Sequence, residues 1–74
     1  MPQTYIIHHC VSTIRNAVWH MTNNHYIVLY VESVIRIPQP GERIEVIHAT
    51  HPVTGLPYIH EVIIPDTGEV IYER

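Results

Sequence analysis

Residues 12–24, which read STIRNAVWHMTNN, decide whether this chain contains a helix. Four apolar residues of the stretch recur at the helical spacing i, i+3, i+4 and i+7. They are Ile14, Ala17, Val18 and Met21. Ser12 can cap the first turn, and the two asparagines that close the stretch can end the helix because asparagine tolerates the left-handed backbone region. The periodicity therefore predicts a short helix over 12–24.

The same stretch also admits a β-hairpin. Thr, Ile, Asn, Val and Trp are mediocre helix formers, and β-branched and aromatic residues favour strands. In this alternative, AVWHM (17–21) pairs with YIVLYV (26–31) across TNNH (22–25). The chain would then be all-β, such as a small barrel.

The flanking segments resemble strands joined by turns. TYIIHHCV (4–11) is a β-rich run before the undecided stretch, and three Pro-to-Gly turn signals divide the second half. The signals are PQPG at 38–41, PVTG at 52–55 and PDTG at 65–68. The runs between them predict strands over 26–37, 42–50, 58–64 and 69–73 that form an antiparallel meander. The sequence thus predicts a single α+β domain with an N-terminal strand, one short helix and a four-strand antiparallel β-meander.

The predicted long strand over 26–37 has two different faces. Its odd-numbered positions are apolar except for Ser33, which predicts a core face. Those apolar positions are Ile27, Leu29, Val31, Ile35 and Ile37. The even-numbered face carries Tyr26 and Tyr30 and is partly polar. A strand of this length is expected to bend, and Glu32–Ser33 is the expected place.

The composition narrows the function classes. The chain has 74 residues, four arginines, no lysine and seven acidic residues, all of them beyond residue 31. The first 31 residues carry one formal charge, at Arg15, so we expect this half to be buried against the rest of the fold or a partner. Scattered arginines without lysine argue against nucleic-acid binding. A single cysteine and the absence of a signal-like or membrane-length apolar run lead us to expect a cytoplasmic protein with no membrane partner.

Seven histidines are the unusual feature of the composition. His8 and Cys10 lie two apart on a predicted strand and so share a face. If the hairpin loop has an odd number of residues centred on Thr54, His48 lies opposite His60, whereas an even loop separates them. The four residues His8, Cys10, His48 and His60 would then suit zinc or copper, if the first strand lies beside this hairpin. The alternative is that the histidines form separate hydrogen bonds, because their spacing matches no strong zinc pattern.

Binding is a better interpretation of this sequence than catalysis. A small enzyme with a Cys10–His pair is an alternative, but a lone cysteine in an apolar strand is usually an inert core residue. Trp19, Tyr26 and Tyr30 are aromatic residues with little charge nearby, a composition typical of protein interfaces. We therefore predict a non-catalytic, oligomerising protein-binding module that acts as an accessory, regulatory or inhibitory protein, of the kind that mobile elements or phages encode.

Overall fold

A computed structural model describes residues 3–12, 16–21 and 25–74, with side chains over 4–8 and 25–74. The described chain is built from antiparallel strands and one 3-10 turn, Val31–Ser33. The strands are β1 (Gln3–Ser12), β2 (Asn16–Met21), β3 (Tyr26–Tyr30), β4 (Arg43–Thr50), β5 (Pro57–Ile64) and β6 (Glu69–Glu73). They form one sheet in the order β3-β2-β1-β4-β5-β6.

The predicted helix over 12–24 is wrong, and the hairpin alternative is confirmed. Residues 16–21 form β2, which pairs with β1 on one side and with β3 on the other. Val18 lies opposite Val28 in β3 and opposite Val11 in β1. A segment with a strand on each side gains more from backbone pairing than the weak helix propensity of residues such as Asn16, Val18 and Trp19 offers. Residues 13–15 and 22–24 of the predicted helix lie outside the described residues.

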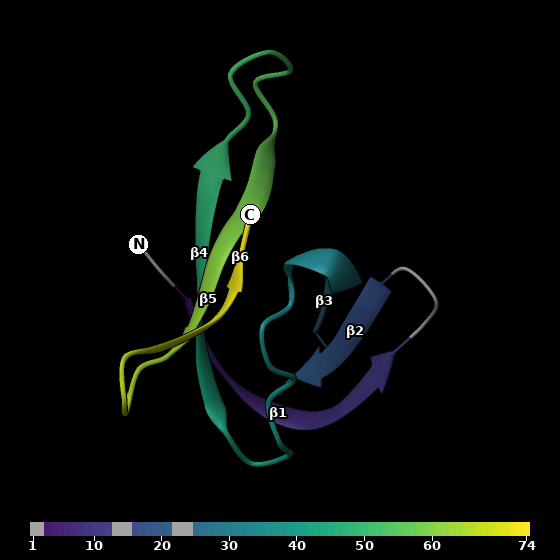
Figure 1. The fold of residues 1–74 in the computed structure, drawn as a ribbon, viewed down its shortest axis with the longest axis vertical. Helices are drawn as coiled ribbons and strands as arrows, with labels where there is room; N and C mark the ends of the chain where they lie inside the picture. The colour runs from purple at the N-terminus through teal and green to yellow at the C-terminus, as the bar shows by residue number, and fades with distance from the viewer. Residues whose placement is uncertain (1–2, 13–15, 22–24) are drawn as a thin grey trace.

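The fold class therefore changes from the predicted α+β to an all-β sheet. No α-helix occurs over residues 3–12, 16–21 and 25–74. The sheet curls on itself, as Figure 1 shows, with β1 sweeping between a half that holds β4, β5 and β6 and a half that holds β2 and β3. One isolated bridge, Val34 to Tyr72, connects the chain after β3 with β6 at the other end of the sheet. The curl resembles the barrel alternative without reaching full closure by strands.

Strand β1 changes its partner along its length. Its first part, from Gln3 to Ile6, pairs with β4, and the part from Ile7 to Ser12 pairs with β2. A bulge between Ile7 and His9 marks the change, and His8 is the extra residue. Bulges bend a strand and increase its twist, so this one explains why the two halves of the sheet face each other.

The predicted four-strand meander is correct only for β4, β5 and β6, which pair in sequence order. The expected strand over 26–37 instead stops at Tyr30, pairs with β2, and enters the 3-10 turn, which confirms the expected bend at Glu32–Ser33. Beyond the turn, the backbone N–H groups of Ile35 and Arg36 both donate to the carbonyl of Ile71, at 2.8 and 3.3 Å. Residues 34–36 therefore lie along the edge of β6.

The turn also changes which side chains face the core. Leu29 is fully buried and Ile27 is partly buried, as the odd-numbered face predicts. Past the turn the phase shifts, so that Val34 packs against the core while Ile35 is 66% exposed. The prediction that Val31, Ile35 and Ile37 belong to the core face is therefore wrong.

The core joins both halves of the chain. Among the side chains that the structure describes, its buried members come from β1, β3, β4, β5 and β6. They are Ile7, Leu29, Ile44, Val46, Val62, Ile64, Ile71 and Tyr72. Ile7 and Leu29, which belong to the charge-poor N-terminal half, are buried in the same core as residues of the meander.

Two isoleucines that meet through their backbones test this assignment of the core. Ile71 is fully buried, whereas Ile35, whose N–H donates to the carbonyl of Ile71, is 66% exposed. We expect Ile71→Ala to lower the free energy of unfolding by about 2–5 kcal/mol and the milder Ile71→Val by about 0.5–1.5 kcal/mol. Ile35→Ala should change it by about 0.5 kcal/mol or less. Urea unfolding measures all three, and a loss for Ile35→Ala as large as that for Ile71→Ala would contradict the assignment.

Candidate protein-binding surface

The two outer strands of the sheet, β3 and β6, differ in how their edges are covered. The edge of β6 is covered by residues 34–36, the first part of the segment 34–42 that leads to β4, and Arg36 holds this part in place. The Arg36 guanidinium donates to Glu69 on β6 through Nε (3.0 Å) and Nη2 (2.8 Å), and through Nη1 to Glu42 (3.0 Å). Glu42 also accepts a hydrogen bond from the backbone N–H of Gln39, at 2.6 Å. A planar guanidinium suits this arrangement because it can engage two carboxylates at once.

Arg36, Glu42 and Glu69 stabilise the charged forms of one another. Hydrogen bonds from Arg36 hold the pKa of Glu69 and the pKa of Glu42 below their usual value, and the Gln39 N–H lowers the pKa of Glu42 further. In turn, the two carboxylates raise the pKa of Arg36. All three side chains contact solvent, so the cluster fixes the path of the segment 34–42 more than it adds to stability.

The strand at the other end of the sheet carries a row of exposed apolar residues. Tyr26 is 62% exposed, Val28 57% and Tyr30 44%, and Val31 in the following turn is 40% exposed. We call these four residues the β3 surface. The strand positions alternate with the buried Leu29 and the partly buried Ile27, so the outward residues form one face of β3.

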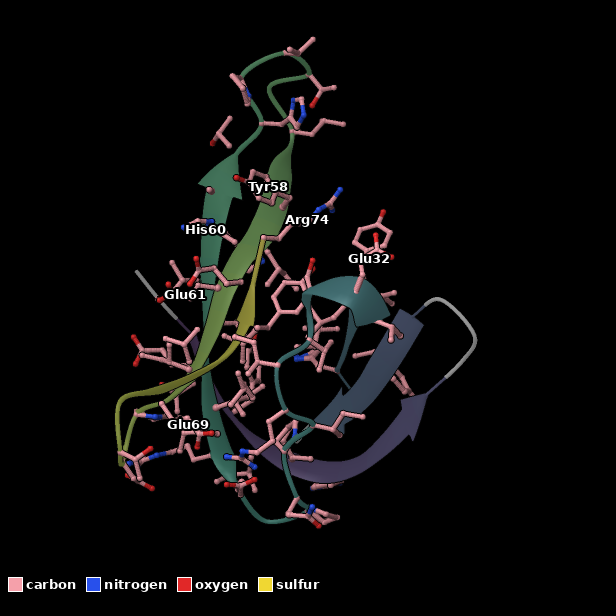
Figure 2. The ribbon with its side chains drawn as sticks, viewed as in Figure 1. Glu32, Tyr58, His60, Glu61, Glu69 and Arg74 are labelled. Carbon is pink, nitrogen blue, oxygen red and sulfur yellow. The ribbon has the colours of Figure 1, made fainter. Side chains whose placement is uncertain are left out.

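Tyr30 has a cation beside its ring. The guanidinium carbon of Arg74, which follows β6, lies 4.1 Å from the centre of the Tyr30 ring, within the range of a cation–π interaction. Arg74 therefore bounds the β3 surface on one side, and it reaches there from the far end of the sheet because the sheet curls (Figure 2). The arrangement gives Tyr30 a defined ring orientation while leaving part of it accessible.

Of the three predicted interface residues, the structure describes the side chains of two. Tyr26 and Tyr30 lie on the exposed face of β3, as the alternation predicted. The backbone of Trp19 lies in β2, opposite Ile27 of β3 and Cys10 of β1. Its side chain lies outside what the structure describes, so its part in an interface stays a prediction.

The predicted His48–His60 pair is wrong because a second bulge interrupts the β4–β5 hairpin. Glu61 lies opposite Ile47, in the register expected from an odd loop, but His48 lies opposite Ile59. His60 is the extra residue of the bulge. Its Nδ1 lies 2.9 Å from the carbonyl oxygen of Arg74, and its ring makes an edge contact with Tyr58 (Figure 2).

Of the residues predicted to bind metal, His8 and His48 lie toward opposite ends of β4. Ile7 exchanges backbone hydrogen bonds with Gly41 and Glu42, which places His8 near the start of β4. His48 lies five residues beyond that start, about 16 Å at a rise of about 3.3 Å per residue. Within the described residues, no group of three or more His, Cys, Asp or Glu side chains could hold a metal ion. The side chain of Cys10 lies outside them, so both the zinc or copper site and the Cys10 nucleophile stay predictions.

The sequence missed two members of the β3 surface and the cluster that covers the other edge. Val28 lies at an even-numbered position of its strand, on the face that was not predicted to be core, but only the two tyrosines of that face were predicted as interface residues. Val31 was assigned to the core because nothing local signalled the 3-10 turn. Arg36 meets Glu69 across 33 residues of sequence, a contact that only the topology creates.

No protein-family model, curated protein or solved structure matches this chain. The described part of the chain also contains no helix with the length and apolar character that a membrane crossing needs.

The Arg36 cluster generates a pH prediction. Glu42 and Glu69 have lowered folded-state pKa values, so their contribution to stability is present above the usual glutamate value of 4.5 and is lost as the pH falls through the lower folded-state values. We expect the melting temperature to decrease below about pH 4.5, and to decrease less steeply in Arg36→Gln, which should already melt lower at pH 7. The measurement is thermal unfolding by circular dichroism between pH 7 and pH 2.

Arg43→Gln is the matched control for this measurement. It removes an exposed ion pair with Asp66 that does not touch the segment 34–42. Such pairs contribute little, so this variant should keep the acid dependence of the wild type. An Arg36→Gln variant whose melting temperature follows the wild-type curve at every pH would show that the cluster does not stabilise the folded chain.

Proposed function

We propose that this chain is a protein-binding module that acts through the β3 surface, as an accessory or regulatory subunit rather than as a catalyst. The observation that carries the proposal is the row of Tyr26, Val28 and Tyr30, each 44% or more exposed, on a strand at the end of the sheet. Single exposed apolar residues are ordinary, but a contiguous row of them is typical of contact sites.

The chemistry of the β3 surface favours a protein as its partner. Strand β3 reads YIVLY and carries no charge, which suits neither phosphate groups nor metal ions. Of the described arginines, Arg36 and Arg43 are paired with carboxylates and Arg74 lies against Tyr30. Tyrosines beside aliphatic residues, with a polar rim, are instead the usual content of protein interfaces.

The alternative role of these tyrosines, as a second packing layer inside the monomer, is less well supported. Residues in such a layer would lose most of their accessible surface to other parts of the chain. Val28 at the centre of the row keeps 57% of its surface, and Ile27 and Leu29 beside it already supply the strand's contribution to the core. The remaining apolar area is therefore available to another molecule.

A photo-reactive residue at position 28 tests the proposal. The full chain is produced in its host cells with a photo-crosslinking amino acid in place of Val28 and, separately, in place of Thr50, an exposed β-branched residue of β4. We expect irradiation to give a discrete protein adduct at position 28 and none at position 50. Mass spectrometry of the adduct identifies the partner and the peptide that lies against β3.

Two results would count against the proposal. The absence of any protein adduct at position 28, in a variant whose circular dichroism matches the wild type, would mean that the β3 surface is not an interface. Equal adducts at positions 28 and 50 would mean that the contacts are non-specific.

A further inference from the structure

The residues of β3 read nearly the same in both directions. Tyr26 and Tyr30 are its ends, Ile27 and Leu29 lie inside them, and Val28 is the centre. The strand is thus a palindrome by residue class: aromatic, aliphatic, valine, aliphatic, aromatic. In a two-fold antiparallel contact, each residue of one copy meets the residue at the mirrored position of the other, so this strand would place aromatic opposite aromatic and valine opposite valine.

The residues of β3 themselves carry none of the usual protection against strand pairing, and the one charged side chain known beside the strand is Arg74, over the ring of Tyr30. Sheet edges are commonly guarded by charged side chains, proline, or a covering segment. The other edge of this sheet has such a cover, where residues 34–36 follow β6 and Arg36 binds Glu69. Strand β3 contains neither charge nor proline, and in the described chain β2 is its single strand neighbour.

We propose that the partner at β3 is a second copy of this chain, paired antiparallel through the edge of β3 with the two-fold axis at Val28. This inference rests on the proposed function and specifies its partner. In this register Val28 meets Val28 of the partner subunit, and Tyr26 meets Tyr30 of the partner subunit. On the core side, Ile27 meets Leu29 of the partner subunit, so that the two sheets become one.

The pairing agrees with the physical rules for neighbouring strands. Aromatic and β-branched cross-strand pairs stabilise antiparallel sheets, and like charges that face each other destabilise them. The proposed register forms two tyrosine pairs and one valine pair on the outer face and brings no charged residues opposite each other between positions 26 and 30. The exposed fractions of Tyr26, Val28 and Tyr30 show that the outer face can accommodate the partner's side chains.

Single cysteines test the register in the full-length chain with Cys10→Ser. Directly opposite residues of an antiparallel pair have Cα atoms about 4.5–5.5 Å apart, which a disulfide can span. Under mild oxidation we expect Val28→Cys to form covalent dimers by itself. Tyr26→Cys should form them when mixed with Tyr30→Cys but not alone, since two copies of position 26 would lie about 13 Å apart.

Native mass spectrometry and light scattering of the wild-type chain give a second readout that needs no substitution. We expect a dimer that dissociates on dilution, and we expect Val28→Lys to weaken it about tenfold or more, because two ammonium groups would meet at the axis. Thr50→Lys on β4, which adds the same charge away from β3, should leave the dimer unchanged.

A chain that stays monomeric at every concentration would overturn the inference, as would covalent dimers of Tyr26→Cys alone that exceed those of its mixture with Tyr30→Cys. The proposed function would fail separately. If the chain is monomeric while the photo-crosslinker at position 28 captures a different, identified protein, the β3 surface is an interface but the partner is not a second copy.

Discussion

The change of partner along β1 is the constraint on which the rest of the structure depends. At the point of change, Ile7 donates its backbone N–H to the carbonyl of Glu42 at 2.9 Å and accepts from the N–H of Gly41 at 2.7 Å. The extra residue at His8 then turns the strand toward β2. One strand thereby belongs to both halves of the sheet, and the fully buried Ile7 side chain lies in the core that the halves share. A chain of this size has little apolar surface to bury, and curling the sheet around one core allows both halves to bury their apolar residues together.

The curl has opposite consequences for the two ends of the sheet. The chain leaves β3 through the 3-10 turn and crosses to β6, because the curl brings the two ends close enough for Val34 to bridge Tyr72. That crossing covers the edge of β6 with residues 34–36, and the same curl brings Arg74 to Tyr30. The residues that would have continued β3 form this crossing instead. Covering one edge within the chain therefore leaves the other edge as the place where a further strand can add.

The sequence predicted the parts of the fold that depend on local signals. The turns at 52–55 and 65–68 were predicted from proline and glycine, and Gly55 and Gly68 have the positive φ that such turns require, 72° and 76°. The strands on either side follow from β-branched alternation, as does the exposed face with Tyr26 and Tyr30. What failed depended on partners distant in sequence. Whether residues 16–21 form a helix or a strand was decided by β1 and β3, which lie on both sides of them.

Bulges explain why the candidate metal site could not be derived from alternation. A period of two fixes which residues share a face only while the register is unbroken, and one extra residue reverses the assignment beyond it. Such an insertion takes His60 out of the register position opposite His48, and another at His8 redirects the strand that carries Cys10. Each bulged histidine follows an isoleucine within a β-rich run, and neither run contains a glycine or proline that would mark the bulge. Strand β3, in contrast, has five residues without a bulge, and there the alternation in the sequence and the exposure in the structure agree.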